Sequence, residues 1–283
     1  MVPDFEESDK ILVVHNDLPH TNQLISMISK HESVGVFVND LSLISPIEKQ
    51  LVDKGAVSRN ISYAVLPGAD YWIRDSGPII VHNKRGELKA LDFDSPKSFF
   101  ANNDIDIAKG YALEIDKLFL CMEGGARESN GKGTMIVTEQ FFTSVCAPLN
   151  KAVFRAQVKE KMGIDKVIWL PYGLLIDGRH ENGPIYENIF SIGSGGHVDE
   201  FCRFIDQKTI LLAEVPDLLL AQHPIYSIEK ERLDRIYRIL KNPRTADGKK
   251  FLIERIPYAP LIFDTIRYPG SDKYRKVVLT SSY

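Results

Sequence analysis

Short apolar runs rich in β-branched residues alternate along the chain with stretches in which apolar residues recur every three or four positions. The first pattern predicts strands and the second predicts amphipathic helices. The predicted strands are residues 11–14, 34–38, 63–66, 79–81, 118–121, 135–138, 167–170, 209–213 and 277–279. This alternation predicts an α/β protein. Because no Pro- or Ser-rich linker interrupts it, we interpret residues 1–283 as a single domain.

Three helices are well marked. They are predicted over residues 45–54, 150–162 and 227–241. The first begins with a capping box formed by Ser45 and Glu48, and Gly55 ends it. In the second, Val153 and Phe154 belong to one apolar stripe.

Composition and charge restrict the class of partner. Hydrophobic residues make up 44% of the chain and charged residues 26%, which is ordinary for a globular protein. The net charge of -3 argues against a nucleic-acid partner, because phosphate binding requires a basic surface. No apolar run approaches the roughly 20 residues that cross a bilayer, and the acidic N-terminus is unlike a signal peptide. We therefore expect no membrane association.

The three cysteines, Cys121, Cys146 and Cys202, are widely spaced and odd in number. This pattern fits a reducing compartment better than a disulfide framework, so we expect a cytoplasmic protein. None has the cationic or helix-start setting that activates a thiolate, and we expect none to be a nucleophile. Because neither a CxxC nor an HExxH pattern occurs, we predict no metal site.

The first polar motif is Trp72-Ile73-Arg74-Asp75-Ser76-Gly77-Pro78, directly before the predicted strand at Ile79. Gly77-Pro78 predicts an irregular loop. The Asp75 carboxylate can accept two parallel N–H bonds from a guanidinium group, and the Trp72 ring can lie against the same cation. The alternative is a structural network of Arg74 with Asp75, and Trp72 in the core.

Two further motifs supply acid–base groups. Glu123-Gly124-Gly125 ends an apolar run, where the acid can hold an imidazole or a ligand, or lie in a solvated turn. In Gly193 to Glu200, His197 and Asp199 are two residues apart, so on an extended strand they would face one pocket. Histidine can act as a general acid and base near neutrality. The alternative for His197 is a structural role.

Together these motifs resemble those of the agmatine deiminase and Porphyromonas-type peptidylarginine deiminase family, within the guanidino-group-modifying superfamily. The resemblance runs from about Ile11 to the C-terminus through W-x-R-D-x-G-P, E-G-G with N-G-x-G-T, and G-H-V-D-E-F. It implies a five-bladed β/α propeller of ββαβ-type units. It also implies hydrolysis of the guanidino group of agmatine or of free or peptide-bound arginine, without a metal or organic cofactor, and a link to putrescine biosynthesis.

The resemblance also implies roles for individual residues. It assigns substrate binding to Trp72, Arg74, Asp75 and Asp199, and catalysis to Asp75, Glu123, His197 and Asp199. Within this set His197 is the proton shuttle, which Glu123 orients, and the two aspartates hold the guanidinium. A cysteine attacks the guanidinium carbon, expels ammonia and forms a covalent thiouronium, which water hydrolyses.

One departure from the family pattern changes the expectation. The catalytic cysteine of the family lies in a Gly-rich motif well beyond G-H-V-D, whereas only Cys202 follows His197 here. Residues 279–283 resemble the start of the family's last blade, cut short. We therefore predict an inactive piece of a deiminase, or else a guanidino-binding protein without a nucleophile. Amidinotransferase chemistry is a third option. An open ring would expose a strand edge. Because an exposed edge invites pairing with another chain, it would favour a homo-oligomer.

Overall fold

The computed structural model describes residues 11–15, 19–68, 72–83, 85–93, 103–146, 150–245, 247–267 and 273–279. These residues form a mixed α/β fold in two compact units. The N-terminal unit contains the described residues from 11 to 119, and the C-terminal unit contains those from 120 to 279. The single catalytic domain predicted from the sequence stays a prediction.

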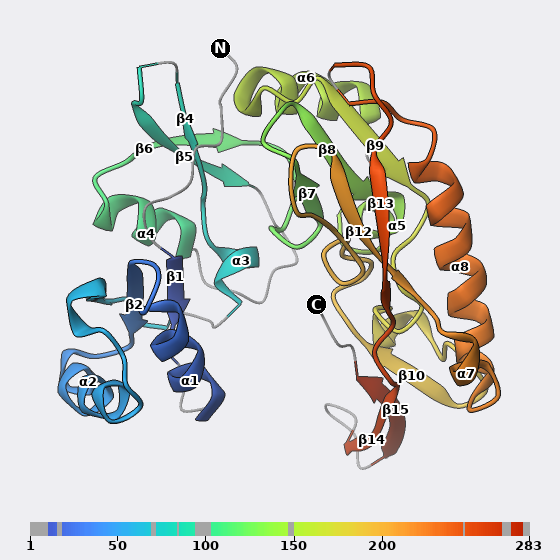
Figure 1. Ribbon diagram of the computed structural model, residues 1–283, viewed down its shortest axis with the longest axis horizontal. Helices are drawn as coiled ribbons and strands as arrows, with labels where there is room; N and C mark the ends of the chain where they lie inside the picture. The colour runs from blue at the N-terminus through green and yellow to red at the C-terminus, as the bar shows by residue number, and fades with distance from the viewer. Residues whose placement is uncertain are drawn as a thin grey trace. The chain divides into compact units, whose positions relative to one another are not determined.

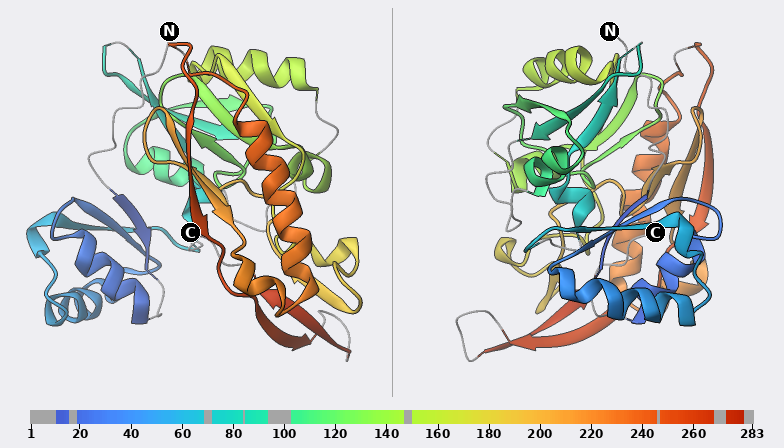
Figure 2. Two further views of the ribbon diagram at one scale, coloured as in Figure 1. Left: turned by 45° about the vertical axis from the view of Figure 1, so that its right-hand side comes forward. Right: turned by 90° about the vertical axis from the view of Figure 1, so that its left-hand side faces the viewer.

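The first sheet of the N-terminal unit is parallel, in the order β1 (Ile11–Val14), β2 (Val34–Val38) and β3 (Ile61–Val65). The crossovers contain α1 (Pro19–Ile28) and α2 (Ile44–Asp53), with the 3-10 helix η2 (Ser58–Asn60) before β3. Since such crossovers are right-handed and both run in the same direction, the two helices share one face of the sheet (Figure 2). Val36 of β2 packs there with Ile25 and Leu51.

The start of α2 differs from the prediction. The 3-10 helix η1 (Leu41–Leu43) runs directly into α2, and the Asp40 side chain caps it by accepting a hydrogen bond from the Ser42 N–H at 2.8 Å. The predicted capping box of Ser45 with Glu48 is wrong, because helical backbone begins already at Leu41 and no side chain caps α2. Gly55 ends the segment with a φ of +78°, as expected.

The remaining elements of the N-terminal unit follow in chain order. They are α3 (Ile73–Ser76), β4 (Ile79–His82), β5 (Leu88–Phe93), α4 (Asn103–Gly110) and β6 (Glu114–Leu118). Strand β4 pairs with β5 antiparallel, and β5 pairs with β6 parallel. The strand predicted over 118–121 therefore ends at Leu118, and the following residues are irregular.

The C-terminal unit repeats this order of antiparallel hairpin, helix and parallel strand (Figure 1). One group is β7 (Arg127–Ser129), β8 (Thr134–Thr138), α5 (Glu139–Ser144), α6 (Lys151–Met162) and β9 (Lys166–Leu170). The next is β11 (Cys202–Phe204), β12 (Thr209–Glu214), α7 (Asp217–Leu220), α8 (Pro224–Leu240) and β13 (Leu252–Pro257).

The last sheet is built differently. Strands β14 (Ile262–Arg267) and β15 (Tyr274–Leu279) form an antiparallel pair. The parallel neighbour of β15 is β10 (Ile189–Ile192), which follows the 3-10 helix η3 (His180–Asn182) earlier in the chain. None of the sheets in the described ranges is closed. Residues 279–283 were predicted to start a truncated last blade. Of these, residues 280–283 lie outside the described residues.

Two helices of the C-terminal unit cover the core, with corrections to the predicted positions. Helix α8 lies alongside β12 (Figure 1) and starts at Pro224, earlier than predicted, because a His223 ring nitrogen accepts a hydrogen bond from the Ile225 N–H. Helix α6 buries Phe154, but Val153 is 47% exposed and does not belong to the buried stripe. In the described residues no helix is both long and apolar enough to cross a membrane.

Candidate active site

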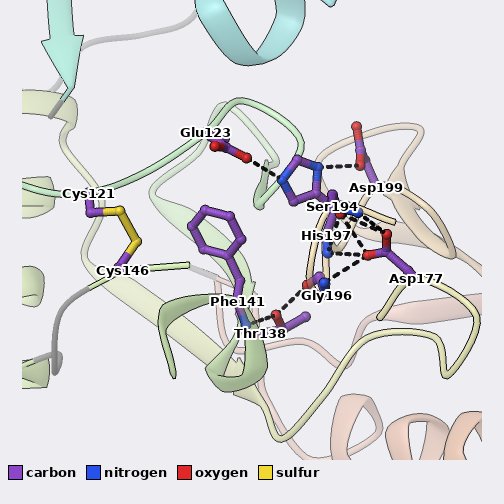
Figure 3. Close-up of polar contacts among 10 residues, drawn as sticks. All are labelled: Cys121, Glu123, Thr138, Phe141, Cys146, Asp177, Ser194, Gly196, His197 and Asp199. Atoms are coloured by element: carbon purple, nitrogen blue, oxygen red, sulfur yellow. Dashed lines mark hydrogen bonds and ion pairs between the residues drawn. A yellow bond between two sulfur atoms is a disulfide. The ribbon is translucent and has the colours of Figure 1, made fainter. Parts of the chain in front are cut away.

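The His197 side chain lies between two carboxylates in the C-terminal unit. Its Nε2 is 2.9 Å from Glu123 Oε2, and its Nδ1 is 3.9 Å from Asp199 Oδ1. Figure 3 shows the ring between these two groups. His197 is only 3% exposed, and both carboxylates are buried as well.

This arrangement suits proton transfer. A neutral imidazole donates from one nitrogen only, whereas an imidazolium donates from both. A carboxylate beside each nitrogen would stabilise the positive charge that the ring carries once it has taken up a proton. An imidazole in this setting can give a proton to a leaving group and take one from water.

The backbone that presents His197 is a turn, not the extended strand predicted from the i, i+2 spacing. Gly195 and Gly196 have φ values of +103° and +112°, which bend the chain just before His197. The Asp199 N–H donates to the Gly125 carbonyl at 3.2 Å. The two side chains thus approach each other through a turn that is tied to the Glu123-Gly124-Gly125 motif, and the strand-based reason for their proximity is wrong.

Several residues around His197 were not recognised from the sequence. Asp177 is fully buried beneath the turn, and Ser194 donates to its carboxylate. The Thr138 hydroxyl donates to the Gly196 carbonyl, and the Phe141 ring centroid lies 5.3 Å from that of His197. Only Ser194 belongs to a segment that the sequence singles out. Asp177 and Thr138 lie far from His197 in the chain and carry no local motif.

Gly196→Ala is expected to destabilise the C-terminal unit by about 1–3 kcal/mol, the usual cost of strained backbone. The φ of +112° disfavours any Cβ, and the new atom would meet the Gln140 side chain at 3.1 Å. Urea unfolding measures the loss. Gly248→Ala is the matched control, since Gly248 has a φ of +81° with no atom within 4 Å of the added Cβ. Equal losses in both variants would contradict a contribution from crowding around Gly196.

The Trp72 to Pro78 segment lies in the N-terminal unit. Most of the predicted loop is instead the single-turn helix α3, in which the Ser76 N–H donates to the Trp72 carbonyl at 3.1 Å, while Gly77 and Pro78 are irregular as expected. Trp72 is 48% exposed, which excludes the alternative of a core tryptophan. Arg74 is exposed and Asp75 half-buried. The structure thus brings Glu123, His197 and Asp199 together, while their convergence with Trp72, Arg74 and Asp75 on one substrate stays a prediction.

The cysteines differ from the expectation. Cys121 and Cys146 form a disulfide with their Cα atoms 5.8 Å apart, so the expectation that the cysteines do not form disulfides is wrong for this pair. The two cysteines are 25 residues apart, so the sequence alone does not indicate that they are in contact. The fold brings them together, because the chain after α5 returns to the segment before Glu123. Cys202 is fully buried in the apolar core, and burial raises the pKa of its thiol. Among the described residues no cluster of His, Cys, Asp or Glu could hold a metal ion.

The fold and the site define an α/β protein with a buried acid–base centre. Residues 14–283 match the sequence profile of the Porphyromonas-type peptidyl-arginine deiminase family, and the chain belongs to this family. An agmatine deiminase of Pseudomonas syringae pv. syringae is 31% identical over 224 residues, which are 73% of this chain and 54% of the relative. That of Pseudomonas syringae pv. tomato is 30% identical over 221 residues, with the same coverage. The chain thus spans about half the length of these curated relatives.

Solved structures show the same fold. The agmatine deiminase of Enterococcus faecalis superposes with a TM-score of 0.72 at 20% identity, over 95% of this chain and 73% of that one. The agmatine deiminase of C. jejuni superposes with a TM-score of 0.63 at 20% identity, over 96% of this chain and 75% of that one. At this level of identity the likeness concerns the fold alone.

Proposed function

We propose that the chain carries the substrate-binding and proton-transfer part of a deiminase that hydrolyses the guanidino group of agmatine or of arginine. The observation that supports this most directly is the buried His197 between Glu123 and Asp199. A protein that only binds a guanidinium needs carboxylates, whereas an imidazole held between two of them serves proton transfer. Membership of the deiminase family favours the same reaction.

In the proposed reaction, Asp75 and Asp199 hold the guanidinium, and Trp72 and Arg74 line the substrate site. A cysteine thiolate attacks the guanidinium carbon. The carbon–nitrogen bond then breaks as His197 passes a proton to the leaving ammonia, and a covalent thiouronium remains. His197 next takes a proton from water, whose oxygen attacks the same carbon, and the thiolate leaves.

The reaction requires a nucleophile that is neither paired nor sealed in the core. Cys121 and Cys146 are bonded to each other, and Cys202 is fully buried with its pKa raised by burial. We therefore predict that the 283-residue chain alone releases no ammonia above the enzyme-free blank from agmatine or an arginine peptide. A coupled ammonia assay measures this. Turnover that disappears in Cys202→Ala would show that the nucleophile has been misplaced.

The second candidate function is guanidino binding without turnover, which the lack of an accessible thiol among these cysteines favours. Calorimetry with agmatine, arginine and a blocked arginine peptide tests binding, with an alkylamine of similar length as the control. Binding of the guanidino compounds but not of the amine supports both candidates, and equal binding overturns both. Reading the gene past the codon for Tyr283 separates them. A Gly-rich segment with a cysteine favours the deiminase, and a stop codon favours the binding protein.

We also propose a propeller arrangement for the whole protein and a cytoplasmic location. The repeated order of hairpin, helix and parallel strand in β4–β6, β7–β9 and β11–β13 supports the propeller. The Cys121–Cys146 disulfide argues against this location, since disulfides persist mainly in oxidising compartments, so the oxidation state of the two cysteines in the native protein tests it.

A further inference from the structure

We propose that Asp177 is a positioning residue that sets the His197 imidazole between Glu123 and Asp199. Its relevance to turnover rests on the proposed function. The effect of Asp177 on His197 does not depend on the proposed function, and it can be measured without substrate.

The Asp177 carboxylate lies inside the turn that precedes His197 (Figure 3). Oδ1 accepts hydrogen bonds from the Ser194 N–H at 2.6 Å and its hydroxyl at 2.8 Å. Oδ2 accepts from the Gly196 N–H at 2.8 Å and the His197 N–H at 2.7 Å. One side chain thus binds the backbone of the residue that carries the imidazole and of the residue before it.

This network explains how the turn is stable without a sheet partner. A buried N–H group costs free energy unless it is hydrogen-bonded, and the turn through Gly195 and Gly196 removes His197 from any strand ladder. The Asp177 carboxylate accepts a hydrogen bond from the Gly196 N–H, and the Thr138 hydroxyl donates one to the Gly196 carbonyl. The backbone at His197 is therefore fixed by side chains from two other segments.

The donors around Asp177 point to an ionised carboxylate, because a protonated acid would set an O–H group against N–H groups. Burial raises the pKa of Asp177 overall, and the nearby His197 and the donors from Ser194 and Gly196 oppose this shift. A carboxylate that receives several N–H bonds is stabilised in its ionised form. Its negative charge then adds to those of Glu123 and Asp199 in favouring the protonated imidazole.

The chain packs closely around Asp177. Residues 178–193 lead away from the site and back to it. Two backbone hydrogen bonds join the ends of this segment: the Gly193 N–H donates to the Gly178 carbonyl, and the Gly195 N–H donates to the Asp177 carbonyl. A Cβ on Gly193 would lie 2.4 Å from Asp177 Oδ1. Any side chain at position 193 would therefore displace Asp177.

Asp177→Asn is the decisive variant, because it keeps the shape but turns one acceptor oxygen into an N–H2 group that faces N–H donors. Amide hydrogen exchange at Gly196 and His197 should accelerate at least about 10-fold, since these bonds protect the amides against local opening. The His197 ring should titrate at a pH lower by about 0.5 units or more, because one of three nearby negative charges is lost. Both are read by NMR on the unliganded chain, with His197→Gln to assign the ring signal.

Asp206→Asn is the matched control. Asp206 accepts bonds from the Lys208 N–H and from the N–H and hydroxyl of Thr209 in the turn between β11 and β12, so it makes the same kind of network elsewhere. It should leave the titration of His197 unchanged. Ser194→Ala removes one donor to Asp177 but leaves its charge in place, so it should accelerate amide exchange at Gly196 and His197 by a smaller amount. It keeps the test valid if Asp177→Asn does not fold.

An unchanged His197 titration in folded Asp177→Asn overturns the proposal, and so does unchanged amide exchange at Gly196 and His197 in Ser194→Ala if the first variant unfolds. A purely structural Asp177 would lower the unfolding midpoint and leave that titration where it was. The proposed function fails separately, through the absence of guanidino binding to the unmodified chain. In that case the NMR result still decides whether Asp177 positions His197.

Discussion

Asp75→Asn should lower the affinity of the chain for agmatine by about 10- to 100-fold, the usual effect of losing a hydrogen bond between charged groups. The substitution keeps the size of the side chain but removes its charge and one of the two acceptors that a guanidinium engages in parallel. Because Asp75 is half-buried, water screens its charge only in part. Isothermal titration calorimetry at fixed pH and ionic strength measures the change.

Asp53→Asn provides the control, because Asp53 is an exposed aspartate at the end of α2 in the same N-terminal unit. It should leave the affinity for agmatine unchanged. An unchanged affinity in Asp75→Asn would remove Asp75 from the proposed site.

A double-mutant cycle of Asp75→Asn with Asp199→Asn then asks whether the two carboxylates hold one ligand. If both carboxylates hold the same guanidinium, their effects on the binding free energy couple, typically by about 0.5–3 kcal/mol. Strict additivity would contradict a shared guanidinium.

The sequence predicted best those elements whose pattern is local. Strands β1 and β2 have the predicted bounds, and β2 is buried along its whole length, as a continuous β-branched run indicates. Helix α6 ends at Gly163, whose positive φ stops the helix. Strand β14 was not recognised because it is largely exposed and contains Asp264 and Thr265, so its place in the sheet depends on pairing with β15 rather than on its own residues.

The residues of the candidate site that belong to sequence motifs were predicted, and those outside the motifs were not. His197 and Asp199 are close in the chain, and the resemblance linked Glu123 to them across a long separation. The role of Asp177 could not be inferred from the sequence. Without a motif, the residues next to a buried aspartate do not distinguish it from an aspartate in a surface turn. The disulfide was missed for the same reason. The proximity of residues 121 and 146 is a property of the tertiary fold.

Loss of that disulfide should give the largest change in stability. Cys146→Ser opens a loop of 25 residues, which in the chain-entropy account costs about 3.5 kcal/mol of the free energy of unfolding. The bond joins two segments that form the site. Cys121 lies two residues before Glu123, and Cys146 follows α5, whose Phe141 packs against His197. Urea unfolding of the oxidised protein measures the loss.

Cys121→Ser should cost the same as Cys146→Ser, because either substitution breaks the same cross-link. A reductant should then lower the stability of the unmodified chain to the level of the variants and leave both variants unaffected. If the reductant has no effect on protein isolated under native conditions, and both thiols react with an alkylating reagent, the disulfide is absent in solution and the cytoplasmic proposal gains support. If the thiols are protected until reduction, an oxidising compartment is favoured, and Glu123 is held in place by a covalent bond as well as by His197.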